Sequence, residues 1–124
     1  RPARVSVKSL ASGRNMSHFI DASDRKPMEL APGVHTRTFW GEQMLLSLVE
    51  VDANTEMPLH THPNEQGGII IEGEFEVGIG GEVKVLKPGD IYIIPGGVEH
   101  YAKALASKVR ALGIYSPVRE EFKY

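Results

Sequence analysis

Glycine and proline recur throughout the chain and divide it into short apolar segments, which limits what the chain can fold into. The 124 residues include 13 glycines and 8 prolines, and these fall between runs rich in β-branched and aromatic residues. No segment keeps a helical period. Eight or more short strands at close spacing are typical of a sandwich or barrel. We therefore expect an all-β fold.

The expected strands follow one another closely in the second part of the chain. They cover 34–40, 43–52, 57–62, 68–78, 82–86, 91–94, 100–104 and 108–115. Gly80-Gly81 is a hairpin signal between two of them. Residues 9–32 are polar and aperiodic, so we assign 1–32 to an N-terminal arm and 33–124 to one β-barrel domain. We expect the charged tail, 119–124, to be solvated.

Composition and charge exclude several classes of function. The net charge is −2, which gives no electrostatic footprint for nucleic acid. No stretch approaches the roughly 18 to 20 apolar residues that span a bilayer. Cysteine is absent, so disulfides and thiolate sites are excluded, and any metal must bind to histidine, carboxylate or amide groups. We expect a cytoplasmic protein without nucleic-acid or membrane partners.

Three of the five histidines form a pattern that predicts a metal site. His60 and His62 lie two apart, and residues at that spacing point to the same face of an extended strand. Gln66 can supply a third ligand after a short turn, and His100 would arrive from a facing strand. Glu65 is the alternative to Gln66, although strand alternation favours Gln66. The sequence therefore predicts one divalent transition metal ion.

The spacing of these residues resembles the two motifs of the cupin superfamily. The first motif runs through His60, His62, Gln66 and Gly73, and the second runs through Gly89, Pro95, Gly97 and His100. The resemblance implies a double-stranded β-helix, the jelly-roll barrel of cupins, with a metal inside near one mouth. It also implies a homodimer, since small cupins usually pair through a sheet and an edge strand would otherwise be exposed.

Further segments look like those of one cupin group. These are 60–66, 71–75, 79–82 and 115–122, which are similar to the KdgF group of small cupins. That group linearises and ketonises 4,5-unsaturated uronates and uses three histidines and a glutamine around a metal. The resemblance implies that Tyr115 and Arg119 bind substrate or move a proton. The group's aspartate corresponds to Gly113, so Tyr92, Tyr101 or Tyr115 could replace the missing acid, or a metal-bound hydroxide could act as the base.

Gln66 has a consequence for the chemistry, because most metal-binding cupins have glutamate at this position. Three imidazoles and an amide leave a divalent ion at its full charge, which favours Lewis-acid chemistry over oxygen activation. Zinc, nickel, manganese, iron and copper all suit such ligands. We expect a metal-dependent isomerase or tautomerase acting on a small acidic substrate, such as an unsaturated uronate or keto acid. The alternatives are a metal-dependent dioxygenase and a non-catalytic ligand-binding cupin.

Overall fold

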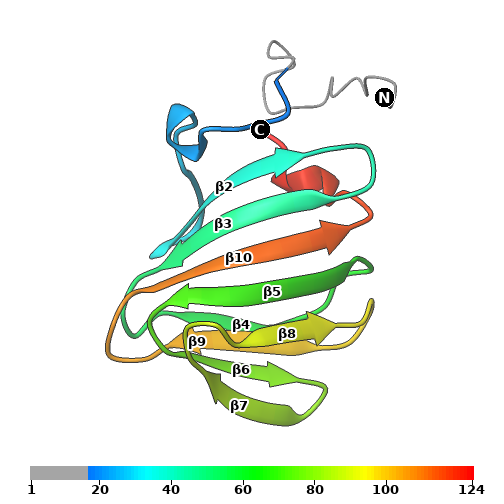
Figure 1. Ribbon diagram of the computed structural model, residues 1–124. Coiled ribbons are helices and arrows are strands. Elements are labelled where there is room, and N and C mark those ends of the chain that lie inside the picture. The colour runs from blue at the N-terminus through cyan, green and yellow to red at the C-terminus, as the bar shows by residue number, and fades with distance from the viewer. Residues whose placement is uncertain (1–16) are drawn as a thin grey trace.

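Ten strands form two antiparallel sheets that face each other, as the computed structural model of residues 17–124 shows (Figure 1). The larger sheet has the order β1 (Met28–Ala31), β2 (Val34–Trp40), β3 (Leu45–Val51), β10 (Val109–Ser116), β5 (Glu65–Glu72) and β8 (Ile91–Ile94). The smaller sheet has the order β4 (Glu56–His60), β9 (His100–Ala104), β6 (Phe75–Ile79) and β7 (Glu82–Leu86). The all-β prediction is confirmed.

Helical structure in residues 17–124 is confined to two single turns. They are the 3-10 helices η1 (Ala22–Asp24) and η2 (Glu120–Phe122). Within the described residues, no helix has the length and apolar character needed to cross a bilayer.

The strand boundaries differ from the expected ones at two places that matter for the site. The segment expected as one strand, 68–78, is two strands, because the chain turns at Gly73 with φ of +86°. A Cβ atom at Gly73 would also lie 2.3 Å from the carbonyl oxygen of Lys108. The other difference is β4, which ends at His60, so that His62 lies in the following loop.

The hydrophobic core lies at the end of the molecule where β2, β3 and β10 bring their valines together. Val34 pairs with Val51, which pairs in turn with Val109, and each is at most 1% exposed. Ile70 and Phe75 pack into the same cluster from the two sheets. Full burial of each such side chain contributes about 1.5–3 kcal/mol. Val34 and Phe75 also line a cavity that extends from this core toward the other end of the sheets.

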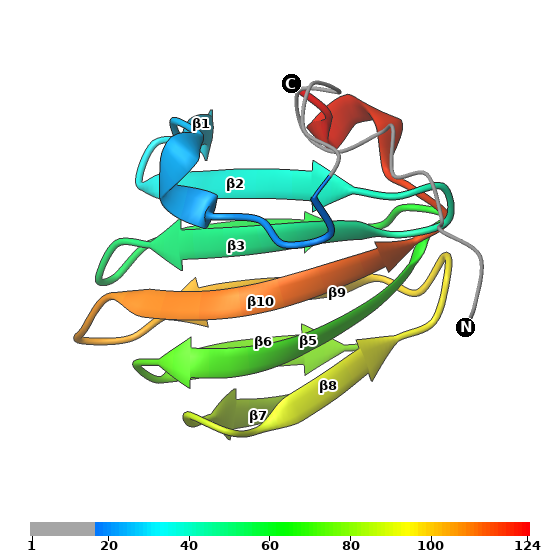
Figure 2. The same ribbon diagram turned by 45° about the horizontal axis from the view of Figure 1, so that its top comes forward.

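Both flanking segments pack onto the larger sheet. Met28 pairs with Thr36, so the last part of the expected arm adds an edge strand, whereas 1–16 lie outside the described residues. The tail 119–124 is solvated only in part: Glu120, Glu121, Lys123 and Tyr124 are exposed, whereas Arg119 and Phe122 are half-buried, and the Thr38 hydroxyl donates a hydrogen bond of 2.6 Å to the Phe122 carbonyl. The Tyr124 hydroxyl likewise donates to the Lys26 carbonyl. Figure 2 shows η2 beside one end of β2.

Candidate metal centre

Three histidines meet at the end of the molecule opposite the valine core. His60, at the end of β4, pairs in register with His100, at the start of β9. The prediction that His60 and His62 share one strand is wrong, yet the loop still turns the His62 ring toward the other two. The candidate ligand atoms of the three residues all lie within 4.8 Å of one another. The histidines therefore form a group that can hold a metal ion.

Two glycines hold the loop that carries His62 against the loop that precedes His100. The Gly97 N–H donates a hydrogen bond of 2.9 Å to the carbonyl oxygen of His62. A Cβ atom at Gly96 would lie 2.3 Å from the carbonyl oxygen of Pro63. Since no side chain fits into that gap, a larger residue at Gly96 would push the two loops apart. The glycines of the second motif thus position a ligand of the first.

Each histidine ring is oriented by a hydrogen bond to a nearby backbone carbonyl. The Nδ1–H groups of His60, His62 and His100 donate to the carbonyl oxygens of Pro58, Asn64 and Val98 at 2.8, 3.0 and 2.9 Å. A carbonyl oxygen only accepts, so the hydrogen of each neutral ring is on Nδ1. All three Nε2 atoms are left with a lone pair for a metal, as in many metal sites where a backbone carbonyl fixes the ligating tautomer.

The surroundings of the Nε2 atoms of His62 and His100 are the observation that fits a cation. His62 Nε2 lies 3.1 Å from Gln66 Oε1. His100 Nε2 is buried and has no hydrogen-bond partner among the described residues. Burial lowers the pKa of His62 and His100, and the Arg119 charge lowers it further, so protonation of these rings is disfavoured. A bound divalent ion would satisfy these lone pairs, and the residues present therefore fit a metal.

Gln66 and Glu65 point to opposite faces of β5. Gln66 is buried and lies in register between Ile94 of β8 and Tyr115 of β10. Glu65 is exposed. The alternation of the strand thus directs the amide inward and leaves the carboxylate in solvent. Of the two residues, only Gln66 is brought together with the histidines.

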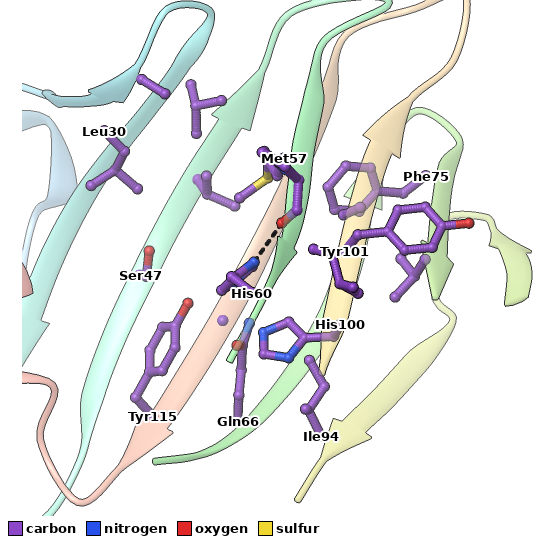
Figure 3. A pocket seen from close by; sticks show the side chains of 18 of the residues that line it. Leu30, Ser47, Met57, His60, Gln66, Phe75, Ile94, His100, Tyr101 and Tyr115 are labelled. Carbon is purple, nitrogen blue, oxygen red and sulfur yellow. Dashed lines mark hydrogen bonds between the residues drawn. The ribbon is translucent and has the colours of Figure 1, made fainter. Parts of the chain in front are cut away.

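A cavity of about 330 Å³ connects this group with the space between the sheets. His60, Gln66, His100 and Tyr115 line one end, and Leu30, Met57 and Phe75 lie at the other (Figure 3). Such a volume is at the lower end of the range for small-molecule sites. The candidate metal group therefore opens into a cavity that can hold a small ligand.

Tyr115 and Arg119 lie together at the metal end of the cavity. The Tyr115 ring is 7% exposed, and its centroid lies 5.5 Å from that of His62. The guanidinium of Arg119 stacks on the Phe122 ring at 4.1 Å and lies 5.2 Å from the Tyr115 ring, while its Nε donates to Glu121 at 2.9 Å. Burial raises the pKa of Tyr115, although Arg119 opposes the shift. The phenol therefore keeps its proton at neutral pH.

The two other candidate tyrosines differ in position. The Tyr101 hydroxyl points away from the histidines and donates a hydrogen bond of 2.8 Å to Glu76, so it is not available to a ligand at the site (Figure 3). Tyr92 points into the cavity, where a Cβ atom at Gly68 would clash with its ring. Burial raises the pKa of Tyr92, and its hydroxyl contacts Gln66.

Sequence reasoning missed Asn64, a buried residue that connects the metal group to the C-terminal segment. Its carbonyl accepts the hydrogen bond from His62, and its side-chain amide donates to the Pro117 carbonyl at 2.7 Å. Asn64 thereby couples the orientation of His62 to the segment that carries Arg119. Its place between two predicted ligands was the only signal for such a role. Phe122 was missed as well, because a charged tail gave no reason to place it in the cavity wall.

Comparisons with known proteins identify the family. The family model for the cupin domain matches residues 47–115. The pectin degradation protein KdgF of Dickeya dadantii (strain 3937) is 29% identical over 108 residues, which are 85% of this chain and 96% of that protein. The similarity to the KdgF group expected from the motifs is thus confirmed.

Solved structures agree with this family in fold. An RmlC-like cupin from Shewanella frigidimarina NCIMB 400 superimposes with a TM-score of 0.80 at 26% identity, covering 86% of this chain and 96% of that one. KdgF from Halomonas sp. gives a TM-score of 0.79 at 25% identity, covering 85% and 97%. The predicted jelly-roll fold is confirmed. With more than half of its length matched and a group of three histidines at the expected place, this chain belongs to the cupin domain family.

Proposed function

We propose that this cupin is a metal-dependent isomerase or tautomerase that moves a proton within a small carboxylated substrate, such as an unsaturated uronate or a keto acid. The observation that carries the proposal is the convergence of atoms with free lone pairs. The Nε2 lone pairs of His62 and His100 and the oxygen of Gln66 meet in a buried site. A divalent ion bound there supplies Lewis-acid polarisation of a substrate oxygen.

The residues at the cavity's metal end suit a carboxylated ligand. Arg119 presents a guanidinium that lines the cavity and can pair with a carboxylate, in competition with Glu121. The protonated hydroxyl of Tyr115 can donate a hydrogen bond or a proton to a substrate oxygen. In the conversion of an enol to a ketone, the enol oxygen gives up its proton, and the carbon next to the new carbonyl carbon gains one. Neither an oxidant nor a reductant is needed.

The proposed ligand set favours this chemistry over oxygen activation. Gln66 is neutral, so the proposed ligands provide no carboxylate of the kind found in the two-histidine, one-carboxylate sites of iron oxygenases. The KdgF proteins to which the chain is similar support a role in uronate metabolism, whereas Gly113 provides no acid at the position of that group's aspartate. The proposal therefore extends to keto acids as well as uronates.

Metal analysis combined with turnover tests the proposal. The purified protein is loaded separately with zinc, nickel, manganese, iron and copper, and bound metal is measured by elemental analysis. Conversion of the enol of a keto acid, and of an unsaturated uronate, is followed by absorbance. We expect turnover that disappears on chelation and in Gln66→Ala. Full activity of the metal-free protein would refute the proposal, and oxygen uptake by the iron-loaded protein would favour a dioxygenase.

We also propose that the active form is a homodimer built on the outer face of the larger sheet. Ile91 and Ile93 of β8 point outward and are 69% and 65% exposed, and Ile71 and Ile114 of neighbouring strands add exposed apolar area. Among residues 17–124, no further strand pairs with the free edge of β8. A second copy is the simplest partner for such a face, because a twofold axis buries the same patch on both copies. Light scattering tests this: Ile91→Lys with Ile93→Lys should give a monomer. A wild-type protein that is monomeric at high concentration would refute it.

A further inference from the structure

The part of the cavity away from the histidines has a chemical character that the proposed function does not use. We call it the apolar chamber, and its wall is made by Leu30, Val34, Val49, Met57, Phe75 and Val77. None of these side chains carries a hydrogen-bonding N–H or oxygen atom. They come from five strands of both sheets, so the chamber lies between the two sheets and is not a crevice within one loop.

Strand register shows how the chamber continues from the metal end. On β10, Tyr115 lies opposite Gln66, Gly113 lies opposite Ser47, and Ala111 lies opposite Val49. The level of Val49 is therefore four residues, or about 13 Å, from the level of Tyr115. Because Gly113 and Ala111 are small, the inward face of β10 leaves the space between the two ends open.

Gly113 forms the passage between the two ends. It lies on an inward position of β10 and lines the cavity, and a Cβ atom there would approach no heavy atom closer than 3.6 Å. The passage is therefore not filled by a neighbouring side chain. A ligand held at the histidines can extend past Gly113 into the chamber.

Two hydroxyl groups near the passage are already bonded within the protein. The Ser47 hydroxyl shares a hydrogen bond of 2.6 Å with Thr36, and the Tyr92 hydroxyl contacts Gln66. A sugar acid that placed its hydroxyl groups in the chamber would lose their hydrogen bonds to water without replacement, and each unpaired group is costly. An alkyl or aryl group has no hydrogen bonds to water to lose, and its burial is favourable because it removes apolar surface from water.

We propose that the substrate has two parts, a carboxylated keto or enol head at the metal end and an apolar aryl or alkyl body in the apolar chamber. This rests on the proposed function for the head group and narrows the substrate class to apolar keto acids. The carboxylate of a polyhydroxylated uronate fits the metal end of the cavity, but its hydroxyl groups do not suit the apolar chamber. Specificity for the body is set by Val49, Met57 and the open passage at Gly113.

Calorimetric titration of the full chain tests the proposal with three probes. Phenylpyruvate has the head and an aryl body, pyruvate has the head alone, and galacturonate is a polyhydroxylated acid of similar size. For the metal-loaded protein we expect phenylpyruvate to bind at least about tenfold more tightly than either of the others. Galacturonate binding as tightly as phenylpyruvate would overturn the proposal.

Matched variants locate the effect in the chamber. Val49→Thr and Met57→Gln place a polar atom in the wall at nearly constant volume, and each should weaken phenylpyruvate at least about threefold and leave pyruvate unchanged. Val83→Thr and Met44→Gln make the same changes at sites that are 56% and 50% exposed, and they should have no effect. Equal losses in the cavity variants and the controls would also overturn the proposal.

The test separates this inference from the proposed function. Elemental analysis before titration shows whether an ion is bound, and failure to load any of the five metals refutes the proposed function alone. The same titrations on metal-free protein then decide the inference, since the chamber's preference for an aryl body depends on Val49 and Met57 and not on the ion. If neither the metal-loaded nor the metal-free protein prefers phenylpyruvate, the inference is refuted, and the proposed metal site is unaffected by that result.

Discussion

Thermal unfolding of His100→Ala, with and without metal, distinguishes a metal ligand from a structural histidine. An ion present at about 100 times its dissociation constant stabilises the folded state by about 2.7 kcal/mol. For 124 residues the unfolding entropy is about 0.26 kcal/mol per degree, so the wild-type Tm should rise by about 10 °C. Without the His100 imidazole, we expect the rise to fall to a small fraction of this.

In the metal-free protein, the same substitution should have little effect. The His100 ring is 5% exposed, and its removal loses packing and the bond to Val98, but it also removes an unpaired buried nitrogen that costs about 1–3 kcal/mol. These effects oppose each other, and we expect a net change below about 1 kcal/mol. The assay is differential scanning calorimetry with each metal and with chelator, and His35→Ala on the outer part of β2 is the control. A metal-induced rise of equal size in wild type and His100→Ala would refute the assignment.

Three further predictions test other parts of the site. Gly113→Asp should fold normally, because a Cβ atom at this position has room. It should raise turnover of an unsaturated uronate, since it supplies a carboxylate. Unchanged uronate turnover would contradict this. Gly73→Ala should lower the free energy of unfolding in urea by at least about 2 kcal/mol, since it strains a left-handed residue and clashes with Lys108. Metal-free protein should lose stability as pH falls below about 6.5, because the lowered pKa of His62 and His100 lets the unfolded chain bind protons first; a flat Tm between pH 7 and 5 would count against it.

The family and the candidate metal group could be predicted from sequence because they depend on local spacing. Turns need glycine and proline at particular positions whatever the distant packing, so the motif around His60, Gln66 and Gly73 is visible in the chain itself. Alternation along β5 likewise placed Gln66 inward and Glu65 outward. The same alternation could have placed Tyr101 outward, since its neighbour His100 points inward.

The cavity and its mouth were decided only by tertiary structure. Arg119 and Phe122 belong to a charged tail with no periodic signal, and they reach the site because Thr38 and Asn64 bind the backbone of the C-terminal segment. The apolar chamber has the same origin, since apolar residues on strands predict burial but not an unfilled space. Whether such side chains close on one another or leave room for a ligand depends on how far apart the two sheets are held, and no local pattern records that separation.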